Sequence, residues 1–184
     1  MRVDAARNRS QILAAARSRI AEQGPDASMD AIAEAAGVAV GTLYRHYPTK
    51  ADLVSAVIED SLGRFADAAE RAAAAVQEGS DALAELAALF VAYAEQHAQD
   101  RALKAASSVL GVPTPDDVTQ YPAGSAAHRA GAAVAHLLDA ARAAGSVRDD
   151  LTLDDLTMLL AAMPDADPQR ARYVQLVLAA VSSR

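Results

Sequence analysis

Cysteine is absent from all 184 residues of the chain. Without it the sequence holds no disulfide framework and no thiolate nucleophile. The four histidines show no H-x₃-H or H-E-x-x-H spacing, so we expect no metal site and no cofactor. The sequence also lacks a Gly-rich phosphate loop and a carboxylate–histidine constellation at catalytic spacing. These absences argue against an enzyme.

Long apolar runs are missing as well. No segment approaches the roughly 20 consecutive apolar residues that span a bilayer. The first ten residues, MRVDAARNRS, lack the apolar stretch of a signal peptide. Apolar residues nevertheless make up 52% of the chain, which is enough to bury a core. We therefore expect a globular, cytoplasmic protein with no membrane partner.

Basic residues are outnumbered and unevenly spread. The formal net charge of −7 argues at first against a nucleic-acid partner. Residues 1–50, however, hold seven basic and five acidic side chains, whereas residues 51–184 hold ten and nineteen. This asymmetry fits a nucleic-acid-binding end on an acidic body. It fits a chance fluctuation of composition equally well.

Strand signals are nearly absent, and apolar residues recur with the period of helices instead. Over residues 8–23, Ile12, Ala16 and Ile20 are spaced four apart, which predicts an amphipathic helix. Gly24 and Pro25 are expected to end it, because neither residue favours continuing a helix.

Two short helices are expected next. Ser28 is suited to cap the first, and Gly37 follows it as a residue that readily adopts a positive φ. The second is expected over about residues 40–46, before Pro48. The buried stripe of the first helix is predicted to be Met29, Ile32, Ala33 and Ala36. The inward side chains of the second are predicted to be Val40, Leu43 and Tyr47.

The remainder of the chain reads as further helices. Thr49 and Asp52 form a capping-box pattern that opens a long helix to about residue 76. Other helices are predicted over residues 81–99, 101–110, 125–144, 152–163 and 168–182. A second capping box is expected at the fourth of these, and Asp167 is expected to cap the last, with Pro168 at its first position. Residues 112–124 hold three prolines and are predicted to be a loop. The expected fold is all-α, with about nine helices.

The N-terminal helices outline a helix-turn-helix around Gly37, an outline that many small helical bundles share. The sequence from Ser28 to Leu53 is more specific. It contains Ala-Gly-Val at 36–38, Gly-Thr-Leu-Tyr at 41–44, an aromatic stop, and Lys50 at the start of the next helix. This pattern closely resembles the signature of the tetracycline-repressor (TetR) family, over roughly residues 8–60. The resemblance implies a helix-turn-helix DNA-binding domain at 1–48 and a helical ligand-binding and dimerisation domain at 49–184.

The resemblance also implies which residues contact DNA. The helix at 40–46 would lie in the major groove. The DNA-binding set is Ser28, Ala39, Val40, Gly41, Thr42, Tyr44, Arg45, His46 and Lys50. Ala39, Val40 and Gly41 have no hydrogen-bond donor or acceptor in their side chains. Arg45 is therefore the main candidate for reading a guanine. A phosphate contact or a free surface charge remains an equal alternative for it.

Other members of this set have ordinary structural alternatives too. Lys50 is otherwise a solvated surface lysine, Tyr44 packs partly in the core, and His46 is a cation at a helix C-terminus. The N-terminal Arg7 and Arg9 are either an arm that reaches DNA or frayed, solvated residues. Where the family often has Phe, this chain has Tyr47, which we expect to pack inward with its hydroxyl at the rim.

The body is expected to hold a ligand and to dimerise. Aromatic and histidine side chains could line a pocket between helices, with the loop at 112–124 as its mouth, or they form a plain core stripe. The predicted ligand-binding residues are Phe65, Phe90, Tyr93, His97 and Tyr121. The last two helices carry apolar stripes that predict a two-fold four-helix interface. The predicted dimerisation residues are Leu156, Leu159, Leu160, Met163, Val174, Val177, Leu178 and Val181.

These features together predict a DNA-binding transcriptional regulator. The expected mechanism is a repressor that binds a palindromic double-stranded operator as a homodimer and is released by an unidentified small-molecule effector. The alternatives are an activator of the same fold, or an architectural or interaction protein without a ligand.

Overall fold

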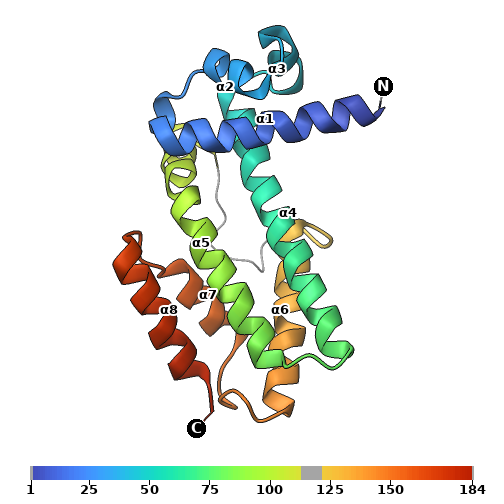
Figure 1. Ribbon diagram of the computed structural model, residues 1–184, viewed down its shortest axis with the longest axis vertical. Helices are drawn as coiled ribbons and strands as arrows, with labels where there is room; N and C mark the ends of the chain where they lie inside the picture. Colours follow the sequence, from blue (N-terminus) through green and yellow to red (C-terminus); the bar gives the residue numbers. More distant parts are fainter. Residues whose placement is uncertain (1, 113–121, 184) are drawn as a thin grey trace. The chain divides into compact units, whose positions relative to one another are not determined.

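The computed structural model describes residues 2–112 and 122–183, with the side chains of residues 2–6 and 97–101 left out. Helices account for the regular structure of these residues (Figure 1). They are α1 (Arg2–Gln23), the 3₁₀ turn η1 (Gly24–Asp26), α2 (Met29–Ala36), α3 (Val40–His46), α4 (Lys50–Gln77), α5 (Ala82–Val109), α6 (Ala126–Ala143), α7 (Leu153–Ala161) and α8 (Asp167–Val181). The only β pairing among the described residues is an isolated bridge between Val147 and Ser182. The predicted all-α fold is confirmed.

Three boundaries differ from the sequence patterns. Helix α1 begins at Arg2, well before residue 8. Helix α5 is continuous from Ala82 to Val109 where two helices were predicted, because no Gly or Pro interrupts it. The expectation that Asp167 caps the last helix is wrong. Ala166 is the N-cap, and Asp167 is the first helical residue, where its carboxylate pairs with Arg170 in the same turn.

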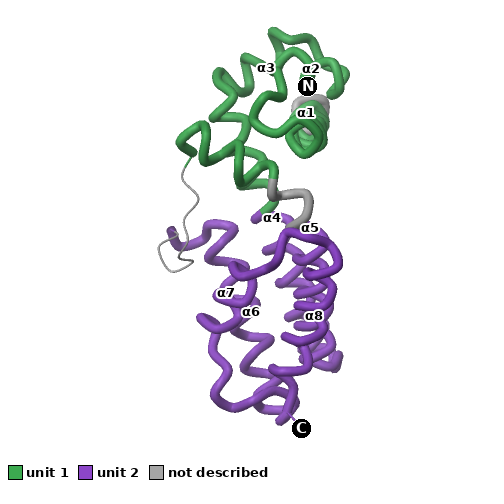
Figure 2. Tube along the Cα trace, turned by 90° about the vertical axis from the view of Figure 1, so that its left-hand side faces the viewer, with its two compact units in different colours: residues 1–61, 99–114 green, residues 62–98, 115–184 purple. Residues whose placement is uncertain are grey.

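The chain divides into two compact units (Figure 2). The first comprises residues 1–61 and 99–114, and the second residues 62–98 and 115–184. Helices α4 and α5 therefore contribute to both. The start of α4 belongs with α1–α3 because Leu53 and Val57 are fully buried in the same core. No helix among the described residues is long and apolar enough to cross a membrane.

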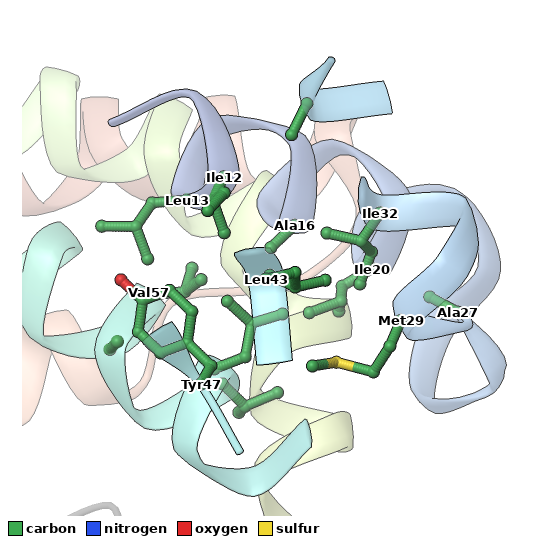
Figure 3. Close-up of a cluster of buried hydrophobic side chains, with 14 of the residues drawn as sticks. Ile12, Leu13, Ala16, Ile20, Ala27, Met29, Ile32, Leu43, Tyr47 and Val57 are labelled. Atoms are coloured by element: carbon green, nitrogen blue, oxygen red, sulfur yellow. The ribbon is translucent and has the colours of Figure 1, made fainter. Parts of the chain in front are cut away.

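The core of the first unit is built from one face of each of its helices. Side chains of α1, α2, α3 and α4 point toward one another around it (Figure 3). Its fully buried members include Ile12, Leu13, Ile20, Ile32, Leu43, Leu53, Val54 and Val57. Burying each such side chain contributes roughly 1.5–3 kcal/mol before the entropy of ordering it is subtracted. The core thus holds α3 in place from behind.

The second unit packs α6, α7 and α8 with the remaining parts of α4 and α5. Small alanines of α4 (Ala69, Ala72 and Ala73) pack against Ala133 and Leu137 of α6. A neighbouring cluster joins α5, α6 and α8 through Phe90, Leu138 and Val177, among others. Alanine at the contact lets helices approach closely, which explains how an Ala-rich sequence still forms a packed body.

Candidate nucleic-acid interface

The turn between α2 and α3 is set by local hydrogen bonds. Ser28 caps α2, its hydroxyl accepting from the Ala31 N–H at 3.1 Å. At the other end Gly37 has φ 66° and ψ 28°, in the left-handed region. A side chain there would be strained even though a Cβ would meet nothing within 4 Å. The predicted cap and turn are confirmed.

Helix α3 has two contrasting faces. Leu43 is fully buried, and Tyr47 at the C-cap is 7% exposed. The neighbouring face leaves Val40 and Tyr44 40% and 45% exposed. The prediction that Val40 faces inward is therefore wrong, because a helix of this length buries a narrow stripe centred on Leu43. Exposed large apolar side chains beside cations make this face a candidate recognition surface. The other exposed predicted residues are Ser28, Ala39, Gly41, Arg45 and His46.

Arg45 and Thr42 are brought together on this surface. The Arg45 Nε donates to the Gly41 carbonyl at 3.1 Å, and its Nη2 donates to the Thr42 hydroxyl at 3.0 Å. The guanidinium is therefore held along its own helix. His46, at the end of α3, lies beside Tyr47 with ring centroids 6.2 Å apart.

Lys50 begins α4 and is half-buried. Its ammonium donates to the carbonyl of Pro25 in η1, a contact that sequence reasoning did not anticipate. The predicted capping box beside it is confirmed, since the Thr49 N–H donates to Asp52 at 2.9 Å and the Asp52 N–H to Thr49 at 3.1 Å. A lysine ammonium carries further N–H donors, so the contact with Pro25 is compatible with a phosphate contact.

Three arginines of α1, Arg7, Arg9 and Arg17, have different surroundings. Arg7 is exposed. Burial raises the pKa of the Tyr47 hydroxyl, and hydrogen-bonded Arg9 offsets part of that rise. Arg17 pairs with Asp60 of α4 at 2.9 Å, which ties α1 to α4. Periodicity could not reveal this pair, because its members are 43 residues apart. Tyr47 packs inward as expected.

The second unit contains a small cavity. Its volume is about 40 Å³, and every side chain that lines it is apolar. Phe65 and Phe90 of the predicted ligand set line it, and Tyr93 meets Phe65 edge-on with centroids 5.7 Å apart. Ligand pockets are usually ~300–1,000 Å³, so this cavity as it stands is too small for a drug-sized molecule. The side chain of His97 and all of Tyr121 lie outside the described residues.

The predicted dimerisation residues pack mostly inside the second unit and are not exposed on its surface. Met163, Val174, Val177 and Val181 are buried in its core. Leu156, Leu159, Leu160 and Leu178 are partly buried against that core. Five of the eight, including Val177 and Val181, also line the small cavity. The large hydrophobic side chains that α7 and α8 do expose are Met158 and Leu176, 61% and 52% exposed.

One hydrogen bond helps to hold α8 against α7. The Tyr173 hydroxyl donates to the Leu159 carbonyl at 2.8 Å. Carbonyls in the last turn of a helix have no partner within it, so a side-chain donor satisfies one of them. Sequence reasoning did not anticipate this role of Tyr173.

Comparison with known proteins covers both units. The family profile "Bacterial regulatory proteins, tetR family" matches residues 12–57, and "Transcriptional regulator SbtR-like, C-terminal domain" matches residues 81–181. A TetR transcription regulatory protein from Mycobacterium vanbaalenii is 34% identical, with a TM-score of 0.77 over 99% of both chains. A TetR transcriptional regulator from Streptomyces coelicolor is 29% identical, with a TM-score of 0.72 over 95% of this chain and 98% of that one.

Curated relatives match about a third of the chain. An HTH-type transcriptional regulator of Staphylococcus aureus (strain bovine RF122 / ET3-1) is 42% identical over 66 residues. The match covers 35% of this chain and 36% of that protein, so it spans about a third of the relative's length.

Proposed function

This chain belongs to the tetR family of bacterial regulatory proteins, DNA-binding regulators of transcription, and we propose that it is a repressor that a small molecule releases from DNA. In this proposal it binds a palindromic operator as a homodimer. Residues 1–48 supply the DNA-binding domain, and residues 49–184 supply the ligand-binding and dimerisation domain.

The observation that carries the proposal is the division of α3 into a buried and an exposed face. Leu43 anchors the helix in the core, while the neighbouring Tyr44 and Arg45 remain exposed. A helix supported from behind can enter the major groove, which admits one helix, without unfolding. Tyr44 would donate a hydrogen bond to phosphate, and Arg45 would reach a base edge.

The test of DNA binding uses duplexes that the wild-type chain selects from a random-sequence pool, compared with scrambled duplexes. Fluorescence anisotropy should show tighter binding to the selected DNA. Tyr44→Ala should weaken that binding by about 2- to 10-fold per half-site, the cost of one hydrogen bond. Arg71→Ala, an exposed α4 residue outside the predicted DNA-binding set, is the control and should bind as the wild type does. Equal affinity of the wild type for selected and scrambled DNA would refute sequence-specific regulation.

Release by a ligand rests on α4, which is one uninterrupted helix from Lys50 to Gln77. Lys50 at its start belongs to the predicted DNA-contacting set, and Phe65 lines the cavity of the second unit. A ligand that enlarges this apolar cavity would displace Phe65 and thereby α4. The lining favours a largely apolar molecule that makes few hydrogen bonds.

A ligand shifts DNA binding only by its differential affinity for the two states. A typical coupling of ~1–3 kcal/mol weakens DNA binding ~5- to 150-fold. Thermal-shift screening should find stabilising compounds, and anisotropy should show that they release selected DNA. The small cavity volume favours one rival, a body that only dimerises. Compounds that stabilise the chain yet leave its DNA affinity unchanged would contradict ligand release.

A further inference from the structure

The two hydrogen bonds that Arg45 makes to its own helix leave a defined part of its guanidinium available. We propose that Thr42 is a positioning residue that orients Arg45 for reading a guanine. This inference rests on the proposed DNA-binding function and goes further, because it assigns a specific role in base recognition to one member of the predicted DNA-binding set.

The argument starts from the shape of the guanidinium, which is a rigid planar fork of N–H donors. Its Nε–H and one Nη2–H lie along one side, and these are the groups that reach Gly41 and Thr42, at 3.1 and 3.0 Å. The outer end, formed by Nη1 and the second Nη2–H, takes part in neither bond. Two parallel N–H groups at that end match the O6 and N7 acceptors of guanine.

Both acceptors can serve without giving up their other roles. The Gly41 carbonyl lies within α3, and a carbonyl oxygen has a second lone pair beyond the one used by the helix. The Thr42 hydroxyl accepts from Arg45 and keeps its own hydrogen to donate to a phosphate. Thr42 can therefore contact the backbone of DNA and orient Arg45 at the same time.

Orientation matters here because the α3 sequence offers few other base readers. Ala39, Val40 and Gly41 have no side-chain donor or acceptor. A long, exposed arginine samples many rotamers, and fixing it on binding costs entropy. Two bonds along the helix restrict that sampling before DNA arrives, so more of the contact energy appears as discrimination between bases.

The experiment compares the wild type with Thr42→Val, Thr42→Ser and Arg45→Ala. Valine keeps the branched shape and removes the hydroxyl, whereas serine keeps the hydroxyl. Each chain selects duplexes from one random-sequence pool, and its affinities are then measured for the wild-type consensus and for every single base-pair substitution in it. A weaker phosphate contact lowers all these affinities alike, so the ratio between consensus and substituted DNA isolates base reading.

We expect Arg45→Ala to lose the preference for guanine at one position of each half-site. Thr42→Val should reduce that preference by about 3- to 10-fold at the same position and leave the others unchanged, the size of one hydrogen bond. Thr42→Ser should restore it. Thermal unfolding of all four chains identifies any effect that comes from loss of folding.

The outcomes separate this inference from the function it rests on. A wild type that selects no consensus overturns the proposed function, and the inference with it. A wild type that selects a consensus while Thr42→Val keeps its full guanine preference overturns the inference alone. The same holds if Arg45→Ala weakens every duplex equally, since Arg45 would then contact phosphate.

Discussion

Adjacent residues of α3 carry opposite tasks. Leu43 is fully buried in the core, whereas Tyr44, which we propose contacts DNA, is 45% exposed. Lys50 combines the two tasks in one side chain, because its ammonium bonds to Pro25 and its predicted partner is a phosphate. Substitutions at such residues must be judged by more than one measurement.

Lys50→Met keeps the apolar stem and removes the charge. We expect it to weaken binding to selected and scrambled DNA alike and to flatten the log–log salt dependence by up to ~0.9 per site, doubled in a dimer. Lys104→Met is the matched control, since Lys104 is exposed and is the other lysine of the chain. Anisotropy over a range of salt concentrations measures both slopes. An unchanged slope for Lys50→Met would mean that Lys50 serves the contact with Pro25 alone.

At the scale of secondary-structure elements, short caps and paired helices determine the geometry. Gly37 ends α2 with a positive φ, whereas Gly63 lies inside α4 without one. In the second unit Arg129 of α6 pairs with Asp67 and Glu70 of α4, each at 2.6 Å. Gly37 thus forms a turn, and Arg129 joins α6 to α4.

The two glycines should respond oppositely to the same substitution. Gly37→Ala forces a Cβ into the left-handed region and should destabilise the chain by about 1–2 kcal/mol. Gly63→Ala meets nothing within 4 Å and should stabilise it by about 0.5–1 kcal/mol, because alanine favours helix. Urea unfolding of both variants gives the two changes in free energy. The same sign for both would contradict the assigned φ of Gly37.

The Arg129 cluster should make stability depend on pH in acid. The hydrogen bond from Arg129 lowers the pKa of Glu70 below its ordinary 4.5. A carboxyl whose folded pKa is depressed stabilises the fold above its unfolded pKa, and this contribution is lost as pH falls through the folded pKa. The unfolding free energies of wild type and Arg129→Gln should therefore differ most near neutral pH and converge in acid.

The control for this measurement is Arg172→Gln, which removes an exposed α8 arginine whose hydrogen bond is to Gln175, a neutral side chain. Its difference from the wild type should show no such convergence. Because the side chains of Arg129, Asp67 and Glu70 are partly exposed, added salt should reduce the contribution of these ion pairs to stability at every pH. A difference for Arg129→Gln that stays constant down to pH values well below 4.5 would refute the coupling.

At the scale of the whole molecule, the proposed homodimer needs an exposed surface that a second copy can cover. The apolar stripes of α7 and α8 are used largely within the second unit, through residues such as Val174 and Val181. What these helices leave exposed is Met158 on α7 and Leu176 on α8. We therefore propose that a homodimer forms through the outward faces of these helices, with those two side chains in the contact.

Met158→Glu and Leu176→Glu should shift the chain toward monomer, because a charge buried at a two-fold interface appears twice. Light scattering coupled to size exclusion at micromolar concentration measures the mass. Val91→Glu is the control, an exposed apolar position on α5. A monomeric wild type would contradict the proposed homodimer. Dimers that persist in both Met158→Glu and Leu176→Glu would show that the interface does not include these two side chains.

What the sequence determined by itself is local. The caps at Ser28 and Thr152 and the turn at Gly37 were predictable because each rests on hydrogen bonds or φ preferences within a few residues. The motif at 36–50 likewise pointed to the family before any packing was known. Of the loop predicted at 112–124, residues 113–121 lie outside the described residues. The two helices predicted at 81–99 and 101–110 form the single helix α5.

Only the tertiary structure decided what each apolar face covers. A periodic stripe predicts that one side of a helix is buried but does not name its partner. Met163 and Val177 were predicted to lie at a dimer interface, and packing places them in the core of the second unit. The contact of Lys50 with Pro25 and the pair of Arg17 with Asp60 join residues far apart in sequence. Their physical reason is the same: such interactions depend on distances that exist only once the helices have packed.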